Sequence, residues 1–568
     1  MRRMKGAAGL LTALLLAFQL SAQTFALANE DNGIKVVPVN FTHNGYSYEI
    51  EGVAKSTDGD YQIKSPARLA ARKLPSTYDP RSSGEITTVK DQASTGACWA
   101  FSALACAEQD LIKKGLENPS AEFSVPALVL SSNSGTATGK DDFSSGGNWL
   151  FAASALANGQ GLCYEDYEPF LESGTGNMIV SENKKSVSEY RLNYVMELSS
   201  TTQVKRKIME LGAVSASYFA GNGYMNHNNT AYYDPDASKN TIINHSVTVV
   251  GWDDNYSKDN FRYKPANNGA WLVKGSWGAD QDNDGFYWVS YDEAEFGQFC
   301  CYDFEESCDN TYHYSKMTGY VVNASNDGSV YGANVFTAKA DEKLDKAGFM
   351  YVGKTGSADY TLSVYTDVSD SDPIGVLETQ ISGSVSANGF YTVDFPEDIL
   401  LEEGEKYSIS VKFSGDSGRG YLLAESDRTS NAQSGQSYVS LNGKYWSDVG
   451  ADKTDSIGSL FIYAYTDDTA KPDKSSLETT LAKYGTLSGC EREANNARTV
   501  LADENASKND ISNAQKLLIS AAEEQDEALV ITTEAQWESF AKRVSSGESF
   551  EGKLVTLEGD LDFDGKTI

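Results

Sequence analysis

Residues 89–102, VKDQASTGACWAFS, surround a cysteine with the groups that a nucleophilic thiol needs. Cys98 begins a pattern that predicts a helix, and the positive end of a helix lowers a thiol pKa and favours the thiolate. Gln92, six residues earlier, offers a side-chain N–H donor. Together with the backbone N–H of Cys98, that donor is suited to stabilise a developing oxyanion. The stretch therefore predicts covalent catalysis by Cys98, with Gln92 in the oxyanion hole.

A catalytic thiolate needs a proton partner, and the chain offers only His43, His227, His245 and His313. His245 alone lies on an apolar, alternating stretch. It follows Cys98 at a separation that falls within the interval of about 130–150 residues typical of such a pair. His227 lies in a loop rich in Gly and Asn, and the other two lie outside the segment that carries the motifs. We therefore predict Cys98 and His245 as the catalytic pair.

Five motifs follow one another between residues 74 and 308: DQASTGACWAFSA, SSGGNW, GAVSASY, NHSVTVVGW, and WLVKGSWG with DGFYWVSY. In this segment the chain resembles the papain-type, cathepsin-like cysteine peptidases. The resemblance implies a two-lobed α+β fold, with Cys98 and His245 on opposite walls of a cleft and Gln92 in the oxyanion hole. The substrate-binding positions that it implies are Gly146, Gly147 and Trp277.

Three positions depart from the family pattern. Gly275 replaces the asparagine that orients the histidine, Thr95 replaces a cysteine, and Gln281 replaces a second tryptophan. Two interpretations of Gly275 stay open. Either a water molecule or Asn244 takes over the orienting role, or His245 is held less well, in which case Gly275→Asn should raise kcat. Because the ion pair itself needs only Cys and His, loss of the third group should slow the chemistry rather than abolish it.

Asp280, Asp282, Asp284 and Gly285 have the spacing of the first half of a calcium loop. Tyr291 occupies the position where glutamate is needed, and a plain connecting loop explains the spacing at least as well. We therefore predict no metal and no organic cofactor. Pairing among the six cysteines other than Cys98 stays open, because six cysteines allow fifteen connectivities.

The elements expected to position these residues begin with helices and end with strands, which predicts an α+β fold. Helical spacing covers residues 98–114, closed by Lys113, Lys114 and Gly115, and about 149–157. Strand patterns cover INHSVTVVGW, GAWLVKGSW and GFYWVSY.

The length of 568 residues predicts several domains. Residues 1–28 have the basic start, apolar run and small-residue cleavage site of a signal peptide, and 29–73 form a pro-segment that we expect to be trimmed near Leu74. The peptidase domain is predicted at 74–308. Short alternating stretches over 312–467 predict an antiparallel β-sandwich, similar to the lectin-like domain of some secreted bacterial relatives. Residues 470–530 resemble a three-helix spacer of Gram-positive surface proteins, and 531–568 the beginning of a β-helix repeat region that we expect to be incomplete.

The charge of the chain narrows the classes of function. Lys and Arg number 47 against 80 Asp and Glu, a net charge of −33, which argues against nucleic-acid binding. We expect no transmembrane segment after the signal peptide. The sequence thus predicts a secreted, extracellular or cell-surface cysteine endopeptidase acting on proteins or peptides, with glycans as candidate ligands of the sandwich. The alternative is a weakened or inactive adhesin that uses the cleft and the sandwich for peptide or glycan binding.

Overall fold

The computed structural model describes residues 36–43, 46–54 and 74–557, the last range with gaps at 133–145, 160, 166–188, 222, 238–241, 280–283, 316–319, 326–327, 370, 417–418, 427–431, 452–456, 470–472, 488, 504–505, 507, 528, 532–536, 538–539 and 541–554. The chain divides into two compact units, Met1–Ala470 and Lys471–Ile568. The predicted signal peptide lies outside the described residues.

The helices of the first unit belong to the peptidase segment: α2 (Cys98–Lys114), α3 (Val125–Ser131), α4 (Trp149–Ala157) and α5 (Thr201–Leu211), with short 3-10 turns at Pro80–Ser83 and Lys258–Asn260. α2 and α4 have the bounds that the sequence predicts. α2 ends where Gly115 adopts a left-handed conformation and its N–H donates to the carbonyls of Leu111 and Ile112. The sequence analysis did not predict α3 and α5, whose N-termini are capped by the hydroxyls of Ser124 and Ser200.

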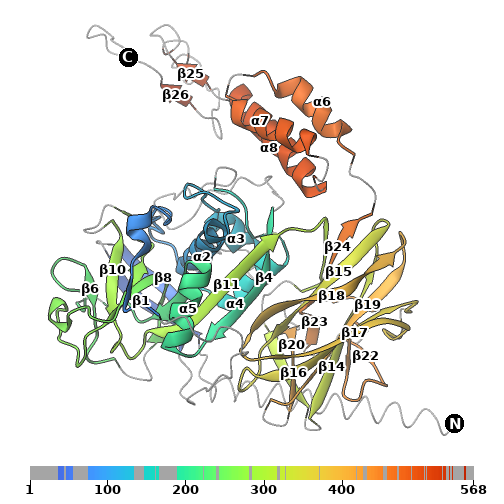
Figure 1. Cartoon of the computed structure of the whole chain (residues 1–568), viewed down its shortest axis with the longest axis horizontal. Helices are drawn as coiled ribbons and strands as arrows, with labels where there is room; N and C mark the ends of the chain where they lie inside the picture. The colour runs from blue at the N-terminus through green and yellow to red at the C-terminus, as the bar shows by residue number, and fades with distance from the viewer. Residues whose placement is uncertain are drawn as a thin grey trace. The chain divides into compact units, whose positions relative to one another are not determined.

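A single twelve-stranded sheet crosses from the peptidase segment into the sandwich segment, in the order β12-β24-β15-β18-β4-β11-β5-β8-β9-β10-β6, with β3 paired to β8 (Figure 1). Its strands are β3 (Thr77–Tyr78), β4 (Tyr190–Leu198), β5 (Val214–Tyr218), β6 (Ala231–Tyr232), β8 (His245–Asp253), β9 (Ala270–Lys274), β10 (Phe286–Ser290), β11 (Gly297–Glu306), β12 (Asn310–Tyr312), β15 (Glu342–Tyr351), β18 (Gly389–Leu401) and β24 (Ile462–Asp468).

Two smaller sheets complete the sandwich segment. The first has the order β17-β16-β19-β14-β21-β22, and the second β13-β20-β23. Their strands are β13 (Tyr320–Ser325), β14 (Ser329–Thr337), β16 (Ala358–Thr366), β17 (Val376–Val385), β19 (Lys406–Ser414), β20 (Gly420–Ser426), β21 (Ser437–Ser440), β22 (Ser447–Asp448) and β23 (Ile457–Leu460). The predicted fold class, an α+β peptidase followed by a β-sandwich, is confirmed.

The two segments share one hydrophobic core, which the sequence analysis did not predict. Leu104 of α2, Leu192 of β4, Phe390 of β18 and Tyr465 of β24 all belong to the same buried cluster. β18 joins β4 through the antiparallel pairs Gly389–Met196, Phe390–Val195 and Tyr391–Tyr194. Since the same backbone ladder and the same core cross the boundary, the sandwich packs as part of the peptidase.

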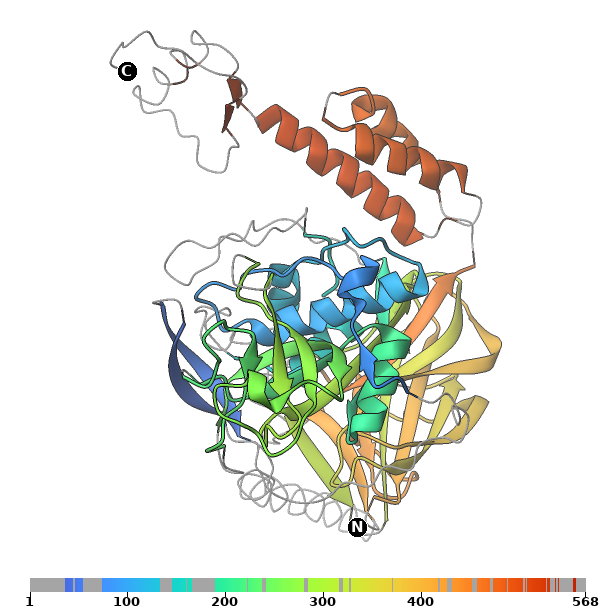
Figure 2. The ribbon, with the colours of Figure 1, turned by 60° about the vertical axis from the view of Figure 1, so that its left-hand side comes forward.

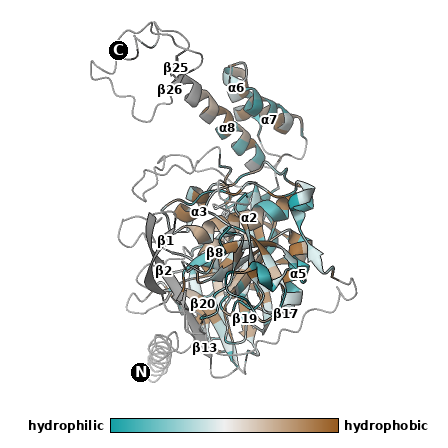
Figure 3. Cartoon of the chain, turned by 90° about the vertical axis from the view of Figure 1, so that its left-hand side faces the viewer, coloured by the Kyte–Doolittle hydropathy of each residue, from teal (hydrophilic) through white to brown (hydrophobic). Residues whose placement is uncertain are grey.

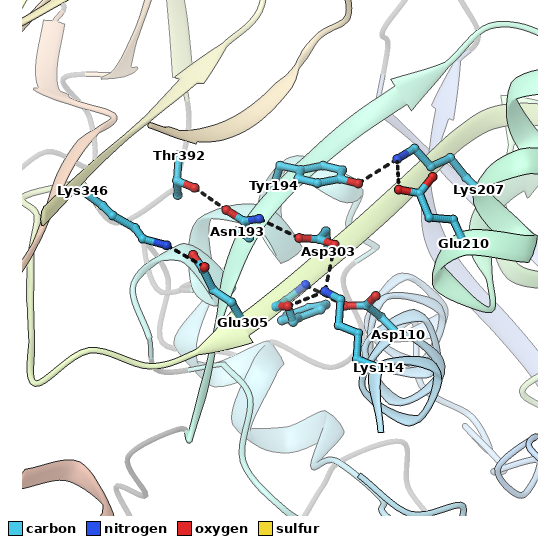
Figure 4. A network of polar contacts seen from close by, with 11 residues as sticks. Asp110, Lys114, Asn193, Tyr194, Lys207, Glu210, Asp303, Glu305, Lys346 and Thr392 are labelled. Atoms are coloured by element: carbon cyan, nitrogen blue, oxygen red, sulfur yellow. Dashed lines mark hydrogen bonds and ion pairs between the residues drawn. The ribbon is translucent and has the colours of Figure 1, made fainter. Parts of the chain in front are cut away.

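A chain of polar contacts crosses the same boundary (Figure 4). The amide oxygen of Asn193 on β4 accepts from the Thr392 hydroxyl on β18, while its Nδ2 donates to Asp303 Oδ2 on β11 at 2.7 Å. Asp303 also receives Lys114 Nζ at 2.8 Å, and the same ammonium lies 2.8 Å from Asp110. The sandwich is therefore bonded, through two intervening strands, to the last turn of the helix that begins at Cys98.

The predicted pro-segment contributes a hairpin, β1 (Val36–His43) and β2 (Tyr46–Ala54), drawn in dark blue in Figure 2. β2 pairs with β7 (Ile242–Ile243), with Val53 opposite Ile243 and Ala54 opposite Ile242. β7 ends two residues before His245, so the hairpin extends a strand that leads directly into the predicted site.

The second unit contains α6 (Ser475–Tyr484), α7 (Glu491–Ala502) and α8 (Lys508–Glu527), which match the predicted helical module. Their core is formed largely of small residues, among them Ala494, Ala497 and Ala514. β25 (Leu529–Ile531) follows and pairs in parallel with β26 (Val555–Leu557). Within the described residues, no helix combines the length and apolar character needed to cross a membrane.

Candidate active site

Cys98 is the first residue of α2 and is 5% exposed. Backbone N–H groups of Ser246, Trp99 and Cys98 itself act to lower the pKa of its thiol, as a helix N-terminus predicts. Burial outweighs these contributions and raises the pKa of Cys98 to about 11. The expected low thiol pKa is therefore not a property of the helix end alone, and a positive partner is needed to ionise this thiol.

Packing of α2 against β8, the strand that begins with His245, brings this histidine's strand to the end of the helix that carries Cys98. The hydroxyl of Ser102, one turn after Cys98, donates to the Val247 carbonyl at 2.7 Å. The N–H and the hydroxyl of Ser246, the residue after His245, act to lower the pKa of the Cys98 thiol. His245 begins β8 and is 2% exposed. Hydrophobic residues of α2 and β8 are coloured brown in Figure 3.

Gln92 is held in a tight turn directly before the helix. Its Nε2 donates to the Thr95 carbonyl at 2.8 Å, and the Thr95 hydroxyl donates back to the Gln92 carbonyl at 2.8 Å. Its Oε1 accepts from the Ser276 hydroxyl at 2.6 Å, which orients the amide. Thr95, which stands in place of the family's cysteine, thus closes this turn with a hydrogen bond.

Gly147 lies against the residue that follows Cys98. A Cβ atom at Gly147 would fall only 2.5 Å from the Trp99 indole, so this close approach requires glycine. The predicted substrate-binding glycines, Gly146 and Gly147, therefore lie beside the beginning of α2. They lead into the Asn148 cap of α4, whose side chain accepts from the Leu150 N–H at 2.9 Å.

Trp277 packs on the imidazole of His245. The two rings are stacked with centroids 4.4 Å apart and an angle of 11° between their planes. Backbone pairing of Asp91 with Trp277, together with the Gln92 N–H that donates to the Ser276 carbonyl at 2.7 Å, joins this segment to the turn before Cys98. The predicted positions Gln92, His245 and Trp277 are therefore brought together.

The segment around Gly275 is anchored by a buried ion pair. Lys274, 4% exposed, donates from Nζ to the Thr87 hydroxyl at 2.6 Å and lies 3.7 Å from Glu108 Oε2 of α2. Glu108 also accepts from the Thr87 hydroxyl at 2.6 Å. A buried charge pair with additional hydrogen bonds fixes the end of β9 relative to α2.

Gly275 is not an empty version of the family's asparagine position. Its N–H donates to the Gly285 carbonyl at 3.1 Å. A Cβ atom added here would lie 3.1 Å from that same carbonyl oxygen and 3.4 Å from Tyr287 Cε1. A side chain at residue 275 would therefore enter space that is bordered by a backbone carbonyl and an aromatic ring, and both interpretations of Gly275 stay predictions.

Asn244, one of the two predicted substitutes for the missing amide, is bonded elsewhere. Its Oδ1 accepts from the Ala220 N–H at 2.7 Å and its Nδ2 donates to the Ala220 carbonyl at 3.4 Å. The side chain thus fixes the turn after β5. Ile243 and Asn244 are both buried, at 4% and 3% exposed.

The other candidate residues lie apart from this site or outside the described part of the chain. His313 Nδ1 lies 3.1 Å from the Ser315 carbonyl, and its ring stacks on Tyr463 in the sandwich. Asp280, Asp282 and Gln281 are not among the described residues. In the part of the chain that the structure describes, no group of three or more His, Cys, Asp or Glu side chains could hold a metal ion. All seven cysteines are described and buried, and no disulfide joins them.

Residues 74–323 match the family description "Papain family cysteine protease", and residues 311–466 match "Lectin like domain". Residues 74–323, called the papain-family segment from here on, are thus similar to that family. The predicted combination of a papain-like peptidase with a lectin-like domain is thereby confirmed. The papain-family segment is similar to cathepsin S of Bos taurus, at 29% identity over 218 residues, 38% of this chain and 60% of that protein. The chain spans about three fifths of the length of the curated relatives it matches.

Solved structures extend the similarity beyond the papain-family segment. The clostridial cysteine protease Cwp84 after propeptide cleavage is 28% identical, with a TM-score of 0.61, over 69% of this chain and 99% of that one. A structure of the cysteine protease and lectin-like domains of Cwp84, a surface layer associated protein of Clostridium difficile, aligns with 80% of this chain and 97% of its own at 24% identity and a TM-score of 0.61. This likeness shows a shared fold across both domains.

The sequence analysis missed Tyr218, Tyr287, Ser246 and Ser276 as parts of the site. Tyr218 ends the motif GAVSASY and Tyr287 lies within DGFYWVSY, but both motifs served only to support the resemblance. Strand alternation places each tyrosine on a face, and only the pairing of β5 with β8 puts Tyr218 opposite His245. One signal in the sequence could have pointed to these tyrosines: glycine at position 275 leaves room for a larger side chain, such as Tyr287, beside it.

Proposed function

We propose that this chain is a secreted or cell-surface cysteine endopeptidase in which Cys98 and His245 form the catalytic pair. The observation that carries the proposal is the packing of α2, which begins at Cys98, against β8, which begins at His245, through the 2.7 Å bond from the Ser102 hydroxyl to the Val247 carbonyl in the papain-family segment. Transfer of the thiol proton to His245 forms a thiolate and an imidazolium. The thiolate then attacks the carbonyl carbon of the peptide bond, and the imidazolium returns the proton to the leaving amine.

Gln92 and the backbone N–H of Cys98 are proposed as the oxyanion donors. An amide NH₂ group carries two hydrogens, and the Thr95 carbonyl takes one of them. The bond from Ser276 to Oε1 fixes which end of the amide is the donor, so the group is preorganised for a negative oxygen. Gly146 and Gly147 would present backbone groups to an extended substrate. Water then hydrolyses the acyl-enzyme, with His245 as the base.

A thiol-directed activity probe tests the catalytic pair. We expect the folded, trimmed wild type to be labelled between pH 4 and 8 and Cys98→Ala not to be labelled. Cys106→Ala is the matched control, because Cys106 lies on the same helix, is buried and is expected to leave labelling unchanged. If the wild type is not labelled at any pH in that range, the adhesin alternative replaces the enzyme.

Export and trimming are also part of the proposal, supported by the signal-like residues 1–28 and by the likeness to Cwp84, whose structure is described as following propeptide cleavage. We expect the mature chain to begin close to Leu74. Amino-terminal sequencing of the secreted protein tests this, and an active enzyme that begins at Asn29 or beyond Tyr78 would contradict it. The lectin-like match likewise supports glycans as ligands of the sandwich, to be tested on a glycan array with the full chain.

A further inference from the structure

The imidazole of His245 belongs to a closed circuit of four aromatic rings. Trp277 stacks on His245 at 4.4 Å and, with a 7° angle between planes, lies parallel to Tyr287 at 6.4 Å. The Tyr287 hydroxyl is 2.8 Å from the Tyr218 hydroxyl. Tyr218 then returns to His245 with its ring at 5.9 Å and 63°. Each ring of the circuit thus contacts two others.

The circuit is built by four different segments of the chain. Tyr218 ends β5 and is the direct cross-strand partner of His245 at the beginning of β8. Tyr287 comes from β10 and Trp277 from the loop that follows β9. Tyr218 and Tyr287 therefore reach across β8 and β9 from both sides and meet at their hydroxyls. Both are buried, at 1% and 4% exposed.

The Tyr287 ring also borders the position from which the family's amide is missing. A Cβ at residue 275 would lie 3.4 Å from Tyr287 Cε1, in van der Waals contact with this phenol. Burial raises the pKa of both phenols, which therefore stay protonated at working pH and keep their hydroxyl–hydroxyl bond.

We propose that Tyr218 and Tyr287 are the positioning residues for His245 in this chain, in place of the side-chain amide that Gly275 lacks. Tyr218 limits sideways movement of the imidazole, and the bond to Tyr287 fixes the tilt of Tyr218. The Trp277 face, which is attractive to a cation, lies against the ring that becomes an imidazolium when Cys98 loses its proton. Packing against these rings thereby helps to orient the imidazole. This inference rests on the proposed function.

The test compares Tyr218→Phe, Tyr287→Phe and the double variant with wild type. Each single change keeps the ring and removes the shared bond, so we expect kcat about tenfold lower with KM within about twofold, since orientation of the proton carrier is felt mainly in the transition state. Because both hydroxyls belong to one bond, the double variant should lose no more than either single variant. The rate of Cys98 alkylation at pH 6 should fall in parallel.

Tyr232→Phe is the matched control. Its hydroxyl donates to the Phe219 carbonyl at 2.6 Å, so it takes no part in the Tyr218–Tyr287 bond, although its ring stands edge-on to Tyr218 at 5.0 Å. We expect this control to lower stability without changing kcat. Single variants that fold and keep wild-type kcat, or single losses that multiply in the double variant, would overturn the inference. A wild type without a reactive thiolate would instead refute the proposed function, and the positioning role with it; should one tyrosine variant fail to fold, the other carries the test.

Discussion

The two sides of the candidate site differ in how they hold their chemical groups. On the nucleophile side, Gln92, Thr95 and Cys98 are fixed by short hydrogen bonds within one turn and by the beginning of one helix. On the histidine side, His245 is packed against rings from two other segments, Tyr218 of β5 and Trp277 after β9. The first arrangement is local in sequence and keeps the glutamine and the cysteine nucleophile of the family pattern, with Thr95 in place of a second cysteine. The second is assembled from distant strands, and Gly275 there replaces the family's asparagine.

This difference indicates which substitutions each side tolerates. A turn closed by backbone and side-chain hydrogen bonds loses a specific partner when one residue changes, and a buried group left unbonded is costly. A packed aromatic cluster can exchange an amide for a ring if the volume is preserved. This segment departs from the family pattern at Gly275, where packing against neighbouring groups holds the histidine. It retains Gln92 and Cys98, where the positions of hydrogen-bond donors determine the function.

The largest expected effect comes from His245→Ala. Burial raises the pKa of Cys98 to about 11, so without a cation roughly one thiol in 10⁴ is ionised at pH 7. We expect the wild type to react with iodoacetamide below pH 7 and the variant to react appreciably only as the pH rises towards 11. Peptide hydrolysis should fall by at least about 10³-fold. The pH dependence of alkylation measures this.

His313→Ala is the control for that experiment, since His313 bonds to Ser315 in the sandwich and should leave the alkylation profile unchanged. If the Cys98 thiol of His245→Ala still ionises below pH 8, some other group provides the positive charge, and the Cys98–His245 pair is wrong.

Gln92→Ala should have the next largest effect. Loss of one oxyanion donor typically lowers kcat by about 10²–10³ with little change in KM. Thr95→Ser, which keeps a hydroxyl for the bond to the Gln92 carbonyl, is the matched control and should stay near wild type. Steady-state kinetics on a peptide substrate distinguish the two. A kcat that survives in Gln92→Ala would remove this residue from the oxyanion hole.

Gly275→Asn should lower kcat by about tenfold or less, which is one of the two outcomes that the sequence left open. The new Cβ would lie 3.1 Å from the Gly285 carbonyl oxygen, a tight contact, and 3.4 Å from the Tyr287 ring. Adding Tyr287→Ala should make space, so the double variant should exceed Gly275→Asn in kcat. A rise in kcat in the single variant would contradict this prediction. It would show that the Tyr287 ring moves readily and that His245 is poorly oriented in the wild type for want of an asparagine at position 275.

Ser276→Ala should have the smallest effect. Its hydroxyl donates to Gln92 Oε1 at 2.6 Å and is a side-chain link between the two sides of the site. Removing one hydrogen bond of about 1 kcal/mol should lower kcat about fivefold and leave KM unchanged. A loss as large as that of Gln92→Ala would mean that the orientation of the amide depends almost wholly on this serine.

Much of the fold and part of the site follow from local pattern. Helix bounds at Cys98–Lys114 and Trp149–Ala157 could be predicted because apolar spacing, a basic last turn and Gly115 act within one or two turns of the chain. The strand that begins at His245 follows from alternation. The pairing of Asn244 with Ala220, and the crowding at Gly275, could not be predicted, because both depend on which strands become neighbours.

The sequence by itself determined the chemistry that is available: a cysteine at a helix N-terminus, one histidine on an apolar strand, a nearby glutamine, and a β-rich segment after the peptidase. Tertiary structure alone decided how the histidine is held and that the sandwich shares a sheet with the peptidase through β4 and β18. The physical reason is range. Hydrogen bonds in turns and the caps of helices join residues a few positions apart, whereas the hydroxyl bond between Tyr218 and Tyr287 joins residues 69 positions apart, which only the order of the strands brings into contact.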